Sequence, residues 1–162
     1  EIKLTVGQKH IQIQIGNYTV ISRLLEGNFL NYRAAVQKSS STKGIVSVPE
    51  FISSLQRVSL LVNDRIRSPI RCFFRENEIC LSCITEMGRA DDRIPAKLEG
   101  DPVEIGFNSS YLLDALQNSE CDEVKLCMNS PIDPLEIMPE KGNSFLFLVL
   151  PVRLKSGGND GE

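Results

Sequence analysis

Apolar and polar side chains alternate strictly from His10 to Ile15, which is typical of a strand with one buried face. Residues 2–6 and 18–24 also have strand character, and the glycine-containing stretches 7–9 and 16–17 between them suit hairpin turns. The sequence therefore predicts three antiparallel strands. Because such a sheet needs another layer over its apolar face, we expect these strands to be the last part of a longer domain.

The hydrophobic spacing becomes helical after residue 44. Ser47 and Glu50 form a capping box with Pro49 in the first turn, so we expect a helix from there to about Asn63. Its apolar side chains recur at helical spacing: Phe51, Ile52, Leu55, Val58, Leu61 and Val62. Its polar face is predicted to carry Ser53, Ser54, Gln56, Arg57 and Asn63. A strand at 45–47 precedes this helix, and strands at 70–75, 78–85 and about 91–98 follow it.

The same order of elements then returns. A strand at 103–107 leads into a helix that Asn108 caps and that includes 111–116, and the strands that follow are 123–128, 134–138 and 145–150. Residues 44–98 and 101–154 are thus two copies of one pattern, a strand, a helix and three strands. This predicts an α+β fold with a pseudo-two-fold repeat. We expect two four-stranded sheets on the outside and both helices together on one side.

The composition changes along the chain suggest four parts. Residues 1–38 hold the last strands of one domain and an interdomain segment, in which 26–36 form a short turn or helix. Residues 39–43 are a polar linker, and 44–154 are a complete second domain. Residues 155–162 are a polar tail that we expect to be disordered.

Charge and cysteine content narrow the functional classes. A net charge of -3 over 162 residues argues against a protein that grips nucleic acid by bulk charge, although one face can still be basic. No secretory or transmembrane segment is visible. Five cysteines without framework spacing argue against a disulfide scaffold and favour a reducing, cytoplasmic compartment.

Catalytic chemistry has few candidates in this sequence. Cys80 and Cys83 have the spacing of a zinc or redox pair, but residues three apart in a strand point to opposite faces. His10 is the only histidine, and neither a nucleophile elbow nor a phosphate-binding glycine loop is present. We therefore predict no catalytic residues, no metal and no cofactor, with an enzyme kept as the rival class.

The C-terminal segment is the most informative part of the chain. Residues 145–150 are apolar without interruption and too few to cross a bilayer, so they predict a strand buried on both faces. Pro151 ends its ladder, and Val152-Arg153-Leu154 follows. Such an end is either a loose strand end or one wall of a binding groove, and the rest of the sequence favours the groove.

Three stretches make the sequence recognisable: LLEGNFLNYR at 24–33, EIGFNSSYLLDAL at 104–116 and LPVRL at 150–154. In this order and spacing they resemble the bacterial DNA polymerase III beta subunits, the replication sliding clamps. The resemblance runs from about residue 1 to Leu154 and covers the end of the family's second domain and all of its third.

The resemblance implies the DNA-clamp fold and a non-catalytic processivity factor. In that family two three-domain subunits form a homodimeric ring around duplex DNA. The ring tethers the DNA polymerase III alpha subunit, the clamp loader and other proteins that carry a clamp-binding motif. A sliding tether needs only loose, sequence-independent phosphate contacts. The alternative is a peptide-binding α+β module unrelated to replication.

The resemblance further implies a groove for an extended peptide with Leu and Phe anchors. Its residues here are Leu30, Ala34 and Ala35 from the interdomain segment, Tyr111 and Ile132 at the edge, and Pro134, Leu148, Leu150, Pro151, Val152, Arg153 and Leu154. For Leu148 and Leu150 an ordinary core position is an equal alternative. For Val152 and Leu154, which follow the proline, we favour the groove.

A dimer contact and a DNA-facing surface are implied as well. The dimer residues are Leu60, Leu61, Glu86, Asp91 and Asp92, and the DNA-facing residues are Arg57 and Arg23. A charged edge that prevents aggregation and plain surface arginines are the alternatives. The chain departs from the family pattern in three ways: Leu30 replaces the usual proline, Arg89 and Arg93 interrupt the acidic run, and residues follow Leu154.

Overall fold

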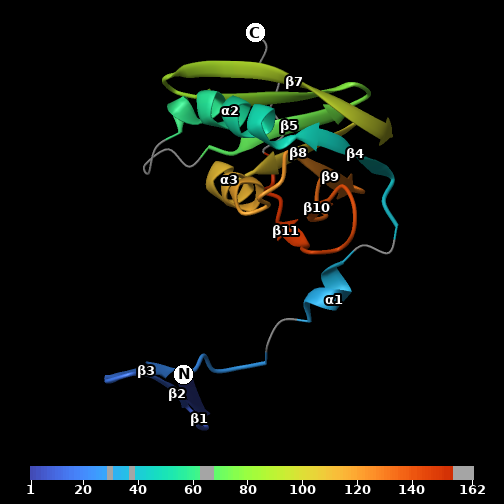
Figure 1. Cartoon of the computed structure of the whole chain (residues 1–162). Coiled ribbons are helices and arrows are strands. Elements are labelled where there is room, and N and C mark those ends of the chain that lie inside the picture. The colour runs from blue at the N-terminus through green and yellow to red at the C-terminus, as the bar shows by residue number, and fades with distance from the viewer. Residues whose placement is uncertain (29–30, 37–38, 63–67, 155–162) are drawn as a thin grey trace. The chain divides into compact units, whose positions relative to one another are not determined.

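A small antiparallel sheet forms at the N-terminal end, as the alternating pattern predicts. The computed structural model describes residues 1–28, 31–36, 39–62 and 68–154, and its contacts divide the chain into two units, Glu1–Arg33 and Ala34–Glu162. In the first unit the strands β1 (Ile2–Val6), β2 (His10–Ile15) and β3 (Tyr18–Arg23) pair in the order β1-β2-β3 (Figure 1). The helix α1 (Tyr32–Ala35) lies at the boundary between the units.

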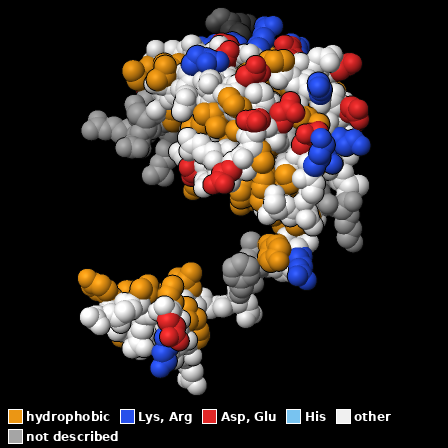
Figure 2. Space-filling view, viewed as in Figure 1, with side chains coloured by type: hydrophobic (Ala, Val, Ile, Leu, Met, Phe, Trp, Pro, Cys, Tyr) orange, Lys and Arg blue, Asp and Glu red, His pale blue; other side chains and the backbone are white. Residues whose placement is uncertain are grey.

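The apolar side chains of this small sheet stay at its surface. Ile2, Leu4 and Val6 are each more than half exposed, and Figure 2 shows hydrophobic side chains on the surface of this unit. Within the described residues of the first unit, no helix or second sheet covers them. The sheet therefore leaves apolar side chains exposed, and its place in a longer domain stays a prediction.

The second unit repeats one order of elements twice. Its first copy consists of β4 (Thr42–Ser47), α2 (Val48–Val58), the 3-10 turn η1 (Ser59–Leu61), β5 (Ile70–Arg75), β6 (Glu78–Thr85) and β7 (Gly88–Gly100). Its second copy consists of β8 (Val103–Phe107), α3 (Ser109–Gln117), β9 (Glu123–Met128), β10 (Leu135–Pro139) and β11 (Phe147–Val149). The predicted α+β class and the repeat are confirmed.

The two expected four-stranded sheets are joined into one. The strands described in this unit form one eight-stranded sheet in the order β11-β10-β9-β4-β7-β6-β5-β8. The first strand of each copy joins the strands of the other copy, since β4 pairs with β9 and β8 pairs with β5. β7 connects the halves because residues 88–95 pair with β6 while residues 96–100 pair with β4. The predicted strand at 91–98 was too short to reveal this double role.

The two helices supply much of the core. Phe51 and Leu55 of α2 and Leu112 and Leu116 of α3 are fully buried, and the helices pack on one another and on the sheet (Figure 1). Both predicted caps form: Ser47 Oγ accepts from the Glu50 N–H at 3.5 Å, and Asn108 Oδ1 accepts from the Ser110 N–H at 3.0 Å. These caps fix where the helices start.

Three local expectations need correction. The helix α2 ends at Val58 and continues as η1, and Asn63 lies outside the described residues. Ser54, expected on the polar face, is fully buried, because α2 packs against both the sheet and α3. β4 begins at Thr42, inside the expected linker 39–43.

The last strand is also different from the expected one. β11 is only Phe147–Val149, lies at the edge of the sheet and pairs with β10 alone. Val149 is buried, but Leu148 is only half-buried and Leu146 and Leu150 are exposed. A strand buried on both faces was therefore the wrong expectation, since an edge strand leaves part of its apolar run at the surface. Over the residues that the structure describes, no helix is long and apolar enough to span a membrane.

Candidate functional site

The C-terminal segment connects the two edges of the eight-stranded sheet. β11 forms one edge and β8 the other. After β11 and Pro151 the chain no longer pairs with β10. Instead, the Val152 N–H donates to the Gly106 carbonyl oxygen of β8 at 2.7 Å. Leu154 then lies against Gly106, so close that a β-carbon built on this glycine would be 2.6 Å from Leu154 Cδ2. The residues after the proline thus belong to an ordered crossing between two strands.

An apolar hollow of about 380 Å³ lies beside this crossing. Tyr111 and Ala115 of α3 form one wall, and the run from Leu146 to Leu150 forms the other. The side chains of Tyr111 and Leu150 are 63% and 66% exposed, although both are large and apolar. Exposed aromatic and aliphatic side chains around a hollow are typical of a surface that binds a partner.

Tyr111 also borders a second, more polar hollow of about 820 Å³. Val152 lies in its wall, together with the α3 N-terminal residues Asn108, Ser109 and Ser110. Tyr111 therefore separates an apolar hollow on one side from a polar hollow on the other. An extended peptide that crossed Tyr111 could bury an apolar anchor in the first hollow and bind by hydrogen bonds in the second.

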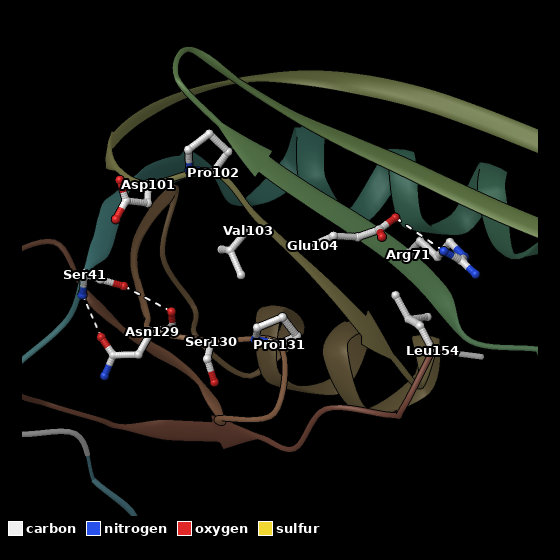
Figure 3. Close-up of a pocket in the computed structure, with 10 residues that line it drawn as sticks. All are labelled: Ser41, Arg71, Asp101, Pro102, Val103, Glu104, Asn129, Ser130, Pro131 and Leu154. Carbon is white, nitrogen blue, oxygen red and sulfur yellow. Dashed lines mark hydrogen bonds and ion pairs between the residues drawn. The ribbon is translucent and has the colours of Figure 1, made fainter. Parts of the chain in front are cut away.

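Leu154 faces a third hollow of about 680 Å³, drawn in Figure 3. Arg71 of β5 and Glu104 of β8 lie close by, with Arg71 Nη1 3.6 Å from Glu104 Oε1. At the other end Asn129 Oδ1 accepts from the Ser41 N–H at 2.6 Å, which fixes the loop after β9 to the start of β4. This hollow is mixed in charge and polarity, and Leu148 and Leu150 do not line it.

The residues expected in the groove are thus distributed over several surfaces. Tyr111, Leu148 and Leu150 line one hollow, whereas Val152 and Leu154 each line another. Pro134 and Ile132 precede β10, and neither lines any of these three hollows. Arg153 is exposed and Pro151 is half-buried. Ala34 and Ala35 end α1, where their relation to the groove stays a prediction, and Leu30 lies outside the described residues.

The apolar hollow also contains residues that the sequence did not suggest. Ala115, Leu146, Phe147 and Val149 line it. Ala115 is four residues after Tyr111 and so shares its helix face, which the helical spacing could have shown. Leu146, Leu148 and Leu150 are two residues apart and therefore lie on one face of the extended chain. Because we expected a strand buried on both faces, this spacing did not single out Leu146.

The residues assigned to a dimer contact lie near the β6–β7 hairpin. Leu60 is 83% exposed and Leu61 is half-buried, and both belong to η1, which contacts β6 and β7. Glu86 lies in the turn of the hairpin, where Met87 is exposed too. This end of the unit therefore presents large apolar side chains beside acidic ones.

Asp91 and Asp92 of β7 have arginine partners within the chain. Asp91 accepts from Arg89 at 2.6 Å, and this hydrogen bond holds the pKa of Asp91 below its ordinary value. Asp92 Oδ2 accepts from Arg57 Nη2 at 2.6 Å and from Nε at 2.9 Å. Arg57, assigned to DNA, and Asp92, assigned to the dimer, thus form one ion pair. Arg23, the other DNA candidate, pairs with Glu26 at 2.8 Å on the surface.

The Arg57–Asp92 pair should stabilise the fold in a pH-dependent way. Partial burial opposes ionisation of Asp92, but hydrogen bonds from Arg57 and the Arg93 N–H outweigh it and lower its pKa. A lowered pKa stabilises the folded state above the unfolded-state pKa of about 3.9, and this stabilisation is lost as the pH falls through the folded-state pKa. We expect Asp92→Asn to cost roughly 0.2–1 kcal/mol near neutral pH, since Arg57 is 58% exposed, and less at about pH 3, below the unfolded-state pKa.

Urea unfolding of both proteins at the two pH values measures this difference. Glu99→Gln, on an exposed position of the same strand, serves as the control. A cost for Asp92→Asn that stays equal at both pH values would show that the ion pair is not its cause.

The cysteines do not form the pair that their spacing suggested. All five carry free thiols, and Cys83 is buried in the core whereas Cys80, on the other face of β6, is half-buried. The described residues contain no cluster of His, Cys, Asp and Glu side chains arranged for a metal. Burial raises the pKa of the Cys72 and Cys83 thiols, so neither is a good nucleophile at neutral pH.

Thiol labelling should separate these cysteines into two groups. We expect Cys80 and Cys121, which are half-buried, to react with a thiol reagent in the folded chain, and Cys72, Cys83 and Cys127 to react only after unfolding. Mass spectrometry of peptides from native and urea-treated samples measures this. Rapid native labelling of Cys72 would contradict the core described above.

Comparisons with known proteins agree with this architecture. The family model of the DNA polymerase III beta subunit, C-terminal domain, matches residues 34–153. The Beta sliding clamp of Proteus mirabilis is 25% identical over 154 residues, which cover 94% of this chain and 42% of that protein. The chain thus spans about two fifths of the length of such relatives.

Solved structures of sliding clamps match this chain with similar sequence identity and coverage. The DNA polymerase sliding clamp of Bacillus subtilis is 26% identical, with a TM-score of 0.83 over 95% of this chain and 41% of that one. A sliding clamp from Bartonella birtlesii, solved bound to griselimycin, is 28% identical, with a TM-score of 0.82 over 94% of this chain and 41% of that one.

Proposed function

Because this chain belongs to the family of DNA polymerase III beta subunits, with its residues 34–153 in the C-terminal domain, we propose that it is part of a ring-shaped sliding clamp. The clamp would surround duplex DNA as a homodimer without reading its sequence, and would hold the replicative polymerase on it. Family membership supports this proposal, and it gives no support to the alternative of a peptide-binding module unrelated to replication. We place the protein in the cytoplasm, where its five free thiols would stay reduced.

The apolar hollow beside Tyr111 is the site we propose for partner peptides. The observation that carries this proposal is that Tyr111 and Leu150 are mostly exposed while they line one hollow with Leu148. Burial of one Leu or Phe anchor contributes roughly 1.5–3 kcal/mol. Two or three anchors, less the cost of ordering the peptide, give roughly micromolar affinity. The alpha subunit, the clamp loader and other partners could then exchange on the same site.

We propose that the protein does no chemistry of its own. A tether needs a closed ring and a docking site, and neither requires a nucleophile, a metal or a cofactor. The raised pKa values of the Cys72 and Cys83 thiols, and the opposite orientation of Cys80 and Cys83, support this view. On the face that Figure 2 shows, acidic and basic side chains are mixed over the second unit, which suits a surface that slides near a polyanion.

A peptide titration tests the proposed site. A fluorescein-labelled peptide with the sequence of a bacterial replicative polymerase tail, with its Leu and Phe anchors, is titrated with the chain and followed by fluorescence anisotropy. We expect a dissociation constant of roughly micromolar size, and none measurable for a scrambled peptide. Equal binding of both peptides would refute a specific groove.

A further inference from the structure

Gly106 is the point where the C-terminal segment touches β8. Its carbonyl oxygen accepts from the Val152 N–H at 2.7 Å, which is the bridge between the two edges of the sheet. A β-carbon on Gly106 would lie 2.6 Å from the Val152 carbonyl oxygen and 2.6 Å from Leu154 Cδ2. Gly106 itself is buried and lines none of the three hollows described above.

The contact geometry also shows which side would yield to a larger residue. β8 is held firmly, because Ile105 and Phe107 are fully buried and the strand pairs with β5 along its length. The terminal segment is held more weakly, since β11 is three residues long and Val152 makes only an isolated bridge. A leucine methyl can turn away, but the Val152 carbonyl oxygen belongs to the backbone. A side chain at position 106 would therefore displace the terminal segment.

We propose that Gly106 is a positioning residue that sets the place of Val152, and through it the geometry of the peptide site around Tyr111. Val152 and Tyr111 line the same polar hollow, and Tyr111 and Leu150, two residues before Val152, line the apolar one. The absence of a side chain at position 106 lets the chain after Pro151 cross from β11 to β8. This inference rests on the proposed peptide-binding function, and it adds a residue that touches no peptide.

The test compares Gly106→Ala with a matched glycine. Gly44 of β4 is a suitable control, because a β-carbon there would also meet a backbone carbonyl oxygen, that of Lys97, and a leucine methyl, that of Leu98. Both variants should be less stable than the unaltered chain. At a temperature where both are folded, only Gly106→Ala should weaken binding of the labelled polymerase-tail peptide, by about tenfold. Val152→Pro, which removes the donor to Gly106 without any change in β8, should have the same effect if Gly106→Ala does not fold.

Hydrogen exchange measured by NMR provides a second readout. The Val152 amide should exchange slowly in the unaltered chain and rapidly in Gly106→Ala, while the Leu112 amide in the core stays protected. Wild-type peptide affinity in Gly106→Ala, or equal weakening by Gly106→Ala and Gly44→Ala, would overturn the positioning role and leave the proposed function intact. Failure of the unaltered chain to bind the peptide would instead refute the proposed function, and the exchange of Val152 would still show whether Gly106 holds the segment.

Discussion

Removal of Val152, Arg153 and Leu154 is expected to weaken binding of the polymerase-tail peptide by at least about tenfold while the fold survives. A tenfold loss corresponds to about 1.4 kcal/mol, which is less than one buried anchor contributes. Val152 lines the hollow next to Tyr111, and its bridge to Gly106 holds the preceding Leu150 in position. The fold should survive because Val152 is 39% exposed and lies outside the buried core cluster.

This prediction is tested with two truncated chains. One ends after Leu154 and lacks only residues 155–162, and the other ends after Pro151. Peptide affinity is measured by fluorescence anisotropy, and circular dichroism melting curves confirm that both chains fold. We expect the first truncation to bind like the full chain and the second to bind much more weakly. Unchanged affinity after the second truncation would remove the terminal segment from the binding site.

Phe51→Ala should destabilise the second unit by about 3–5 kcal/mol, the largest stability effect we predict. The ring of Phe51 is fully buried on the inner face of α2, where this helix packs against the sheet and α3. Its removal loses the burial of the ring and leaves a cavity. Because domains of this size are stable by about 5–15 kcal/mol, the variant should unfold at a much lower urea concentration.

Leu60→Ala is the matched control for this experiment. Leu60 is also a large apolar residue and follows α2 closely, but its side chain is 83% exposed. Its removal should change the free energy of unfolding by less than about 0.5 kcal/mol. Equal costs for Phe51→Ala and Leu60→Ala would mean that the core does not lie where the burial pattern puts it.

Much of the secondary structure could be predicted because it depends on local signals. The alternation from His10 to Ile15 marked a strand, and the capping residues Ser47 and Asn108 marked two helix starts. The repeat of element order gave the α+β class. These features follow from side-chain period and backbone hydrogen bonding within a few residues.

The long-range pairing could not be predicted from the same signals. Nothing near Gly88 or Gly100 shows that β7 pairs with β6 at one end and β4 at the other. Likewise, the sequence of residues 145–150 fits a central strand as well as an edge strand. Only the sheet order decides between them, and that order depends on residues far apart in the chain.

The sequence led to a candidate site among the last residues, but it did not show how those residues are arranged. The position after Pro151 drew attention to Val152 and Leu154, because a proline ends a ladder, and their role in binding stays a prediction. That these two residues line different hollows depends on the crossing to Gly106, which is a contact between residues 46 apart in sequence. The pairing of Arg57 with Asp92 is a second such case, since each had been assigned a different role.

A crystal structure of this chain with the polymerase-tail peptide bound tests the central claim most directly. We predict that an apolar anchor of the peptide lies in the hollow formed by Tyr111, Leu148 and Leu150, and that the rest of the peptide passes over Tyr111 toward Val152. A peptide bound on another face, with this hollow empty at saturating peptide concentration, would contradict the assignment of a docking site beside the carboxyl end.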